Sequence, residues 1–198
     1  MPHEIETRRI VADAINQPTR TNGAALARST DSLSSDAKLN IVHYRCQLKS
    51  DLVIVSDVDN AAKGGGAKLF DFPDGYVTIL GARIEGSLTT DVADLTSTAG
   101  ELGLGTTVAS GAVAVLGGTA GFENILEGAQ PALSNFTAGN DLAVKQGGGI
   151  RAGAIGAFGS AAGCFLNVAS TWGNVASAAD VSAKSGMVIE VWALVVEA

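Results

Sequence analysis

Few residues in this chain have the types and the spacing that chemistry requires. The histidines are His3 and His43, and neither belongs to a His-x-x-x-His or Cys/His array of the kind that binds zinc. A Ser-His-Asp site would have to use His43, and the sequence has no Gly-x-Ser-x-Gly elbow to present the serine. We therefore interpret His43 as a packed or surface side chain and expect no catalytic residue.

Acidic and glycine-rich stretches are the other candidates for a site. Asp57 to Asn60 resembles the start of a calcium loop, but alanines follow where a ligand and the turn glycine belong. Asp91 and Asp94 could serve glycoside chemistry only if another acid faced them. Lys63 to Lys68 contains three glycines but lacks the Gly-Lys-Ser/Thr ending of a phosphate loop, so we interpret it as a flexible loop. We expect no metal, no cofactor and no enzymatic activity.

Composition and net charge disfavour proteins that bind nucleic acids or anionic membranes. The net charge is −7, from 13 basic and 20 acidic residues, which argues against binding to nucleic acid or to an anionic membrane. The 25 glycines favour turns and close backbone approaches. A chain of 198 residues forms one domain, or one domain with an arm.

The sequence shows no clear signal peptide, membrane span or cysteine pair. Residues 1 to 15 carry charges and no apolar h-region, so we expect no signal peptide and folding in the cytosol. The run from Ala152 to Leu166 is too short and too rich in glycine to predict a membrane span. Cys46 and Cys164 are far apart in apolar surroundings, which favours two buried free thiols over a disulfide.

The end of the chain gives the clearest structural signal. From Met187 to Val196 every residue except Glu190 is apolar, and β-branched and aromatic residues dominate. Alternation leaves both faces largely apolar, which predicts a central strand covered on both sides. A buried helix is the alternative, and it is disfavoured because Val, Ile and Trp lose χ1 freedom in helices.

The rest of the chain also reads as β structure. Strands are predicted at Leu39–Gln47, Asp51–Asp57, Lys68–Phe72, Tyr76–Thr89, Thr106–Ala109, Ala112–Leu116, Leu142–Lys145 and Gly163–Ser170. Loops are predicted at residues 59–66 and 175–184, and a loop or short helix at 91–102. Alternation in Tyr76–Thr89 is clean only after Gly81, which marks a candidate bulge.

These signals predict an all-β fold, a β-sandwich or jelly-roll-like domain over residues 38–198. The expected core includes Ile54, Leu80, Ile84, Phe165, Val191 and Trp192.

Residues 1–37 are polar and form a predicted N-terminal arm, extended or partly helical. A frayed terminus without a role is one interpretation. In the other, the arm orders against a neighbouring subunit or the surface it binds. The candidate contact residues are Ile5, Arg8, Arg9, Ile10, Val11 and Ile15.

Three stretches carry a resemblance to a known group of proteins. They are Leu69 to Ala82, with its Pro-Asp-Gly turn before a valine-rich strand, Phe165-Leu-Asn-Val, and the closing Gly-Met-Val-Ile-Glu-Val-Trp. Together they resemble a group of small, acidic tailed-phage virion proteins found among head structural proteins. The resemblance covers residues 65 to 196 in order and brings no catalytic residue with it.

The resemblance implies a non-enzymatic structural protein of a bacteriophage virion, made in the host cytoplasm and placed on the capsid surface as a decoration or cement protein. Its implied partners are the major capsid protein and copies of itself, with no nucleic acid and no membrane. The alternative is a receptor- or glycan-binding jelly-roll module of a tail or head fibre. That alternative needs exposed aromatic side chains, and Trp172 is the only tryptophan in a predicted loop.

Overall fold

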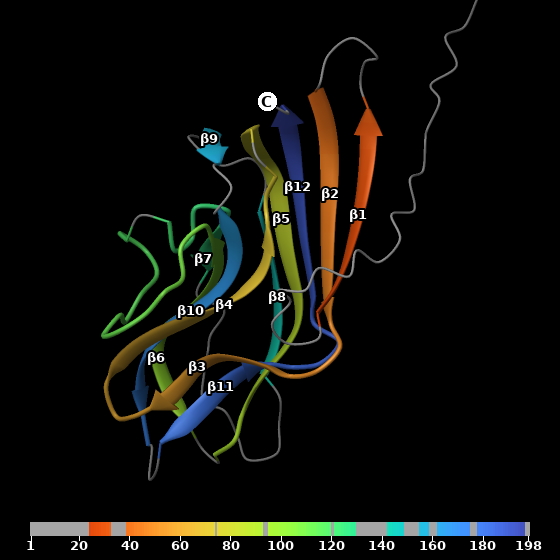
Figure 1. Cartoon of the computed structure of the whole chain (residues 1–198). Coiled ribbons are helices and arrows are strands. Elements are labelled where there is room, and N and C mark those ends of the chain that lie inside the picture. The colour runs from red at the N-terminus through yellow and green to blue at the C-terminus, as the bar shows by residue number, and fades with distance from the viewer. Residues whose placement is uncertain are drawn as a thin grey trace, which may run out of the picture.

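The structure is a computed structural model that describes residues 24–32, 39–73, 75–92, 95–119, 121–129, 142–148, 155–158, 162–174 and 178–196. Two antiparallel sheets pack face to face as a β-sandwich, which confirms the predicted all-β fold (Figure 1). The described part of the chain contains no helix, so the helical alternative for its C-terminal segment is wrong.

The larger sheet has eight strands. Its main path is β1 (Ala24–Ser32), β2 (Leu39–Leu48), β12 (Val188–Val196), β5 (Gly75–Thr90), β11 (Ala179–Ala183) and β3 (Leu52–Val58), and β8 (Leu142–Gly148) and β9 (Ile155–Phe158) also pair with β5. The smaller sheet has the order β4 (Ala62–Asp71), β10 (Gly163–Gly173), β6 (Thr96–Gly105) and β7 (Leu126–Ala129).

The final strand is central, as its composition predicts, because β12 pairs with β2 on one side and with β5 on the other. Every second residue of β12 from Ile189 to Val195 is fully buried against the smaller sheet. The opposite face is covered less completely than expected, since Val188, Trp192 and Leu194 are only half buried. The chain therefore cannot complete its main sheet without its last residues.

The core lies between the sheets. Tyr44 of β2 stacks on Phe70 of β4 with 4.9 Å between ring centroids, and Phe72 meets both rings edge-on. Aromatic pairs of this geometry contribute about 0.5–1.5 kcal/mol each beyond the apolar area that they bury. This cluster ties the two sheets together near the β4–β5 connection.

Half of the predicted core residues are buried and half are not. Ile54, Ile84 and Val191 are buried. Leu80 is half buried because it is the extra residue of a bulge opposite Trp192 and Ala193, beside the predicted position Gly81.

Phe165 and Trp192 are half buried because strand alternation turns them to the outer faces of their sheets. In each case both sequence neighbours on the same strand are buried.

The glycine run predicted as a flexible loop is instead the start of β4. A β-carbon on Gly65 would lie 2.2 Å from Val55 Cγ2 and 2.5 Å from the Ile54 carbonyl oxygen on β3. On the other side of the strand, a β-carbon on Gly66 would overlap the Asn167 side chain. Glycine is required here because β4 is packed closely from both sides, not because the backbone must be mobile.

Three further predictions about strands were wrong. The region 91–102, predicted as a loop or helix, contains most of β6, whose inward residues Leu102 and Leu104 are fully buried. The predicted loop 175–184 contains β11, whose inward residues are small. The two strands predicted within residues 106–116 are absent from the described residues, because that backbone bonds mainly to side chains and forms one isolated bridge, Gly64 to Gly111.

The N-terminal arm is extended where the structure describes it. Residues 24–32 form β1, which pairs antiparallel with β2 along nine register positions from Ala24–Leu48 to Ser32–Asn40. The larger sheet therefore begins inside the predicted arm, before residue 38. The predicted contact residues of the arm lie outside the described residues: Ile5, Arg8, Arg9, Ile10, Val11 and Ile15.

Candidate functional site

The outer face of the larger sheet is the first candidate surface. Strand pairing arranges its side chains in rows across β2, β12 and β5: Ile41 with Leu194 and Thr78, His43 with Trp192 and Gly81, Arg45 with Glu190 and Arg83, and Gln47 with Val188 and Glu85. Lys145 of β8 extends the last row. We call this set the outer sheet face, and it changes from apolar to charged along the strands.

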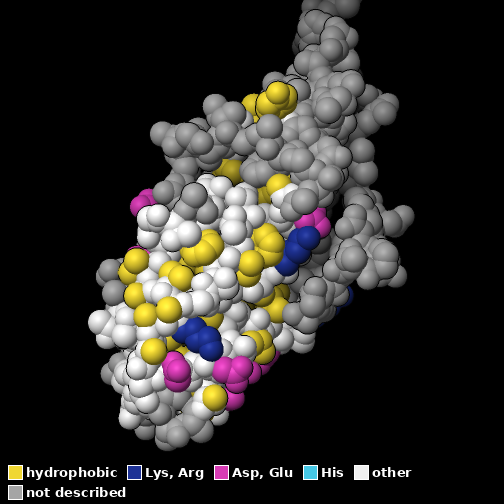
Figure 2. Space-filling view, turned by 60° about the vertical axis from the view of Figure 1, so that its left-hand side comes forward, with side chains coloured by type: hydrophobic (Ala, Val, Ile, Leu, Met, Phe, Trp, Pro, Cys, Tyr) yellow, Lys and Arg dark blue, Asp and Glu magenta, His cyan; other side chains and the backbone are white. Residues whose placement is uncertain are grey.

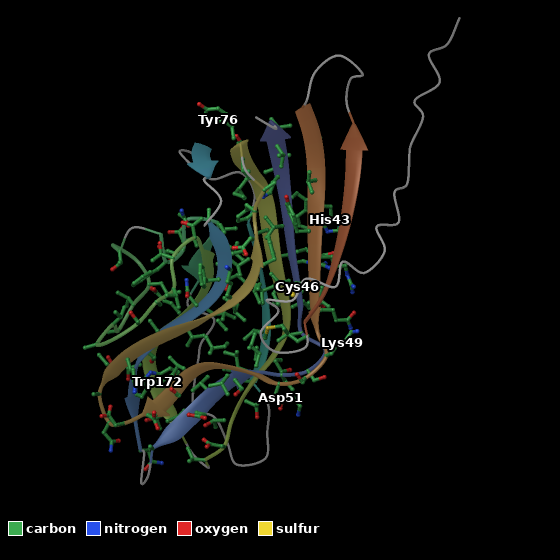
Figure 3. The ribbon with its side chains drawn as sticks, viewed as in Figure 1. His43, Cys46, Lys49, Asp51, Tyr76 and Trp172 are labelled. Atoms are coloured by element: carbon green, nitrogen blue, oxygen red, sulfur yellow. The ribbon has the colours of Figure 1, made fainter. Side chains whose placement is uncertain are left out.

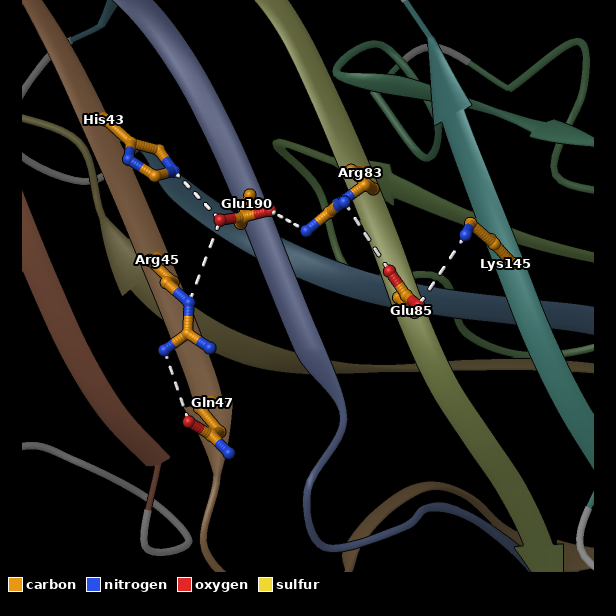
Figure 4. Close-up of polar contacts among 7 residues, drawn as sticks. All are labelled: His43, Arg45, Gln47, Arg83, Glu85, Lys145 and Glu190. Carbon is orange, nitrogen blue, oxygen red and sulfur yellow. Dashed lines mark hydrogen bonds and ion pairs between the residues drawn. The ribbon is translucent and has the colours of Figure 1, made fainter.

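Glu190 is the centre of the charged rows (Figure 4). Its Oε2 lies 2.6 Å from Nη2 of Arg83, and its Oε1 lies 3.8 Å from Nε of Arg45 and 3.3 Å from Nε2 of His43. The His43 contact is close but is not aligned as a hydrogen bond. The Glu190 side chain is 9% exposed, whereas those of Arg45 and Arg83 are 42% and 45% exposed. A nearly buried carboxylate is thus offset by two half-exposed guanidinium groups.

The rest of the network is more exposed. Glu85 lies 3.6 Å from Arg83 and 3.8 Å from Lys145, and Arg45 Nη1 donates to Gln47 Oε1 at 3.2 Å. Exposed pairs of this kind contribute about 0–1 kcal/mol each. They extend the network from Glu190 across β2, β5 and β8.

The aromatic row borders the charges. The rings of His43 and Trp192 stack with 4.8 Å between centroids and 3° between planes. Gly81 lies opposite Trp192 on the other neighbouring strand, so the indole has a ring on one flank and a residue without a side chain on the other. With Ile41 and Leu194 of the next row, these residues form what we call the Trp192 patch.

The loop after β6 is the second candidate surface. The sequence from Leu102 to Phe122 contains no charged residue, and residues 106–119 cover the outer side of the smaller sheet. A small apolar cluster fixes the loop there: Ala109, Leu116, Phe122 and Ala169, with Val113 packed against them. Figure 2 shows this side of the molecule, where hydrophobic side chains are scattered among uncharged ones and a few charged side chains lie in the lower half and at the edges.

A buried asparagine holds the loop onto the sheet. Asn167 of β10 is fully buried. Its Oδ1 accepts a bond from the N–H of Ala109 at 2.9 Å, and its Nδ2 donates to the carbonyls of Thr107 at 2.9 Å and Phe122 at 2.7 Å. One side chain thus satisfies three backbone groups that have left the sheet ladder.

Glu101 anchors the other end of the loop, and Glu123 fixes the segment that follows it. Glu101 Oε2 accepts hydrogen bonds from the N–H groups of Leu116 and Gly117, and Glu123 Oε2 accepts one from Gly128 N at 2.6 Å. Val108 and Val115 remain 40% and 38% exposed, although the backbone on which they stand is fixed. We call residues 106–119 the uncharged loop face.

Asp57 of the calcium-loop candidate and Asp91 of the glycoside candidate both contact Asp180 of β11. Asp180 Oδ1 accepts from Asp57 N at 3.0 Å, and Asp91 Oδ1 accepts from Asp180 N at 2.8 Å, so each carboxylate caps the backbone of the next strand. Among the described residues, no three His, Cys, Asp or Glu side chains converge as metal ligands. Asp94 lies outside them.

Trp172 is not a loop residue. It belongs to β10, is 2% exposed, and donates from its indole N–H to the carbonyl of Lys63 at 2.8 Å (Figure 3). Tyr76 is 62% exposed and points outward at the other end of the sandwich. The exposed tryptophan that the glycan-binding alternative would use is therefore absent from this position.

The two cysteines are buried free thiols, as the sequence predicts. Cys46 extends from β2, and Cys164 from β10 of the opposite sheet. Burial raises the pKa of the Cys164 thiol well above its usual value, and electrostatic repulsion from Cys46 raises it further. The Cys164 thiol is thus held in its neutral form.

Sequence reasoning missed the residues that build the uncharged loop face. The only signal for Asn167 was its position in the apolar run Phe-Leu-Asn-Val, where a buried amide needs partners. Glu101 and Glu123, which flank the uncharged stretch, gave no signal of their own.

Comparison with known proteins adds no relative, since no family model, no curated protein and no solved structure matches the chain. In the described residues there is no helix long and apolar enough to span a membrane. The fold and the two surfaces thus define a β-sandwich that offers one charged and one uncharged face.

Proposed function

We propose that the protein is a non-enzymatic structural component of a tailed-phage virion, a decoration or cement protein that binds the head lattice as an oligomer. Its partners are the major capsid protein and copies of itself, and its place is the capsid surface after synthesis in the host cytoplasm. Two lines support the proposal: the resemblance of residues 65–196 to small head proteins, and the character of the uncharged loop face.

The observation that carries the proposal is the fixed backbone of that face. Asn167 and Glu101 tie the loop to β10 and β6 through buried or half-buried hydrogen bonds. A loop that is already ordered loses little conformational entropy when it binds. It therefore suits a protein that must contact many identical lattice sites with a small surface.

The chemistry of the face also fits a protein partner. Charged residues are depleted at the cores of protein interfaces, and Leu102 to Phe122 has none. Val108 and Val115 provide apolar tips that complementary pockets can bury, at about 1.5–3 kcal/mol for each side chain if burial is complete. A nucleic acid or an anionic membrane would instead require basic residues on this face.

The test is binding to purified heads that lack the protein. Val115→Asp and Val108→Asp place a charge on the loop face, and Val53→Asp is the matched control, because Val53 is 46% exposed on β3, on the other side of β4. We expect the two loop variants to lose at least tenfold in affinity in a co-sedimentation assay and the control to bind as the parent does. Unchanged occupancy by both loop variants would reject this face as the contact.

A further inference from the structure

We propose that the outer sheet face binds a second copy of the same chain, so that two larger sheets pack face to face about a two-fold axis. This inference concerns the protein alone in solution. It names the surface through which copies meet in the proposed oligomer, and it does not depend on binding to a capsid. Its failure would leave the proposed contact between the uncharged loop face and the head lattice untouched.

The outer sheet face is partly apolar and partly charged, and both parts reach the solvent. Ile41, Trp192 and Leu194 are half buried on strands whose other side already packs in the core. The side chains of Arg45 and Arg83 are 42% and 45% exposed. Tryptophan and arginine are among the residue types that contribute most to binding at protein interfaces. The composition of this face therefore fits a protein partner.

The register of the strands decides where a two-fold axis can lie. About an axis parallel to the strands, each residue faces the copy of the residue at the same distance on the other side of the axis. If the axis ran along β12, Glu190 would face its own copy, and Arg45 would face Arg83 of the second copy. Like charges that face each other across an interface are unfavourable, so this position of the axis is excluded.

An axis between β12 and β5 gives the opposite result. Glu190 is the cross-strand partner of Arg83, so the Glu190 of each copy would face the Arg83 of the other (Figure 4). The remaining charged residues of the face would each lie opposite an uncharged one: Arg45 with Gly147, Lys145 with Gln47, and Glu85 with Val188. About this axis the face is complementary to itself in charge.

The apolar rows fit the same axis. Trp192 would face Gly81, which has no side chain, and Leu194 would face Thr78. A large side chain opposite a position without one lets the two faces approach closely. An axis parallel to the strands also keeps the strands of both copies in nearly the same direction, which is the aligned arrangement in which β-sheets commonly pack.

The size of the face indicates a weak dimer. Four rows, two residues apart, on the four strands β2, β12, β5 and β8 cover roughly 500 Å² of sheet on each copy. Two such faces bury about 1,000 Å², which is at the low end of specific interfaces. We therefore expect a dissociation constant in the micromolar range.

Fluorine NMR of the parent chain tests the surface without any substitution. 5-Fluorotryptophan labelling gives one resonance for each of the two tryptophans, and Trp172, 2% exposed in β10, is the internal reference. The Trp192 resonance should shift over the concentrations at which sedimentation velocity shows dimerisation, and the Trp172 resonance should not. A dimer that forms without a shift of Trp192 would overturn the proposal, and so would a chain that stays monomeric up to about 1 mM.

Charge reversal tests the facing pair directly. Arg83→Glu places a carboxylate opposite Glu190 of the second copy, and we expect it to weaken dimerisation at least tenfold. Lys68→Glu is the matched control, because Lys68 is 44% exposed on β4 of the smaller sheet, and it should dimerise as the parent does. Equal dimerisation by Arg83→Glu and the parent would reject the contact.

A mixture of two variants identifies the axis. Glu190→Arg should also lose dimerisation at least tenfold, because arginines then face each other. Mixed in equal amounts, Glu190→Arg and Arg83→Glu bring opposite charges together at both facing positions, so a heterodimer should form with an affinity within about threefold of the parent. A mixture that associates as weakly as the separate variants would reject this axis. If Glu190→Arg does not fold, the comparison of Arg83→Glu with its control decides.

Discussion

The side-chain oxygen of Asn167 accepts a 2.9 Å hydrogen bond from the backbone N–H of Ala109, a residue 58 positions earlier in the chain. The same amide donates to the carbonyls of Thr107 and Phe122. Asn167 therefore replaces, for one loop, the hydrogen bonds that a neighbouring strand would supply. The rigidity of the uncharged loop face depends on this one buried side chain.

Replacing Asn167 should cost both stability and loop order. Asn167→Ala leaves the three backbone groups of Ala109, Thr107 and Phe122 without a partner, and each buried unsatisfied group costs about 1–3 kcal/mol. We expect a loss of at least about 3 kcal/mol in urea unfolding, with faster amide exchange across residues 106–119. Asn124→Ala is the control, because Asn124 is exposed where it binds Thr106, and it should cost under about 1 kcal/mol. Equal losses from the two variants would contradict this role of Asn167.

The close contact of β3 and β4 gives a second prediction. Gly65→Ala would place its β-carbon 2.2 Å from Val55 Cγ2 and 2.5 Å from a backbone oxygen, so the strands must separate. Overpacking of this kind costs about 1–3 kcal/mol, and the backbone contact places this variant at the upper end. Gly117→Ala meets nothing closer than 3.6 Å and should change stability by less than about 1 kcal/mol. Thermal melting of the two variants makes the comparison, and an unaltered melting temperature for Gly65→Ala would refute the packing argument.

Glu190 should contribute more to stability than its exposed neighbour Glu85. Glu190→Gln removes the nearly buried charge that Arg83 and Arg45 face, and we expect a loss of about 1–2 kcal/mol, because the half-exposed arginines regain some hydration. Glu85 is 46% exposed, so Glu85→Gln should stay within about 0.5 kcal/mol of the parent. Both losses are measured as free energies of unfolding at low and high salt. If Glu85→Gln loses as much stability as Glu190→Gln, burial of the carboxylate does not determine its contribution.

The buried thiol predicts how stability depends on alkaline pH. Burial raises the pKa of Cys164, so it stays protonated in the folded chain above about pH 8.5, where an unfolded thiol ionises. The folded state then binds more protons than the unfolded state, and its stability falls as the pH rises further. The melting temperature of the parent minus that of Cys164→Ala should therefore decrease between pH 8 and pH 10. A constant difference over this range would mean that the thiol does not titrate differently on folding.

The sequence allowed correct prediction of those strands in which large apolar residues form a long run or alternate with polar ones. The continuous apolar run of β12 and the change of face at Gly81 both follow from alternation, and the structure shows them in the expected places. Ile54, Ile84 and Val191 were found in the core for the same reason. The half-exposed position of Trp192 was missed because a run that is apolar on both faces does not tell which face packs against the second sheet.

The strands made of small residues were missed because they are stabilised by packing contacts with other strands. Their own sequence shows no pattern of alternating large apolar residues. Gly65 belongs to a strand since Val55 occupies the space that its side chain would fill, and this contact joins segments that no local pattern relates. The inward positions of β11 are Ala179, Val181 and Ala183, too small to stand out from a loop. The fixed backbone of the uncharged loop face could not be predicted from the sequence either, because the hydrogen bonds that hold it come from Asn167, which lies on β10.

The proposed function requires many copies of this protein on the head of a virion. Quantitative mass spectrometry of purified particles, with isotope-labelled peptides of this chain and of the major capsid protein as standards, measures the copy number directly. A decoration protein that binds the lattice should be present at a fixed ratio to the major capsid protein, on the order of one copy per one to a few lattice subunits. A handful of copies per particle would place the protein in a tail or spike, and absence from washed particles would contradict a structural role in the virion altogether.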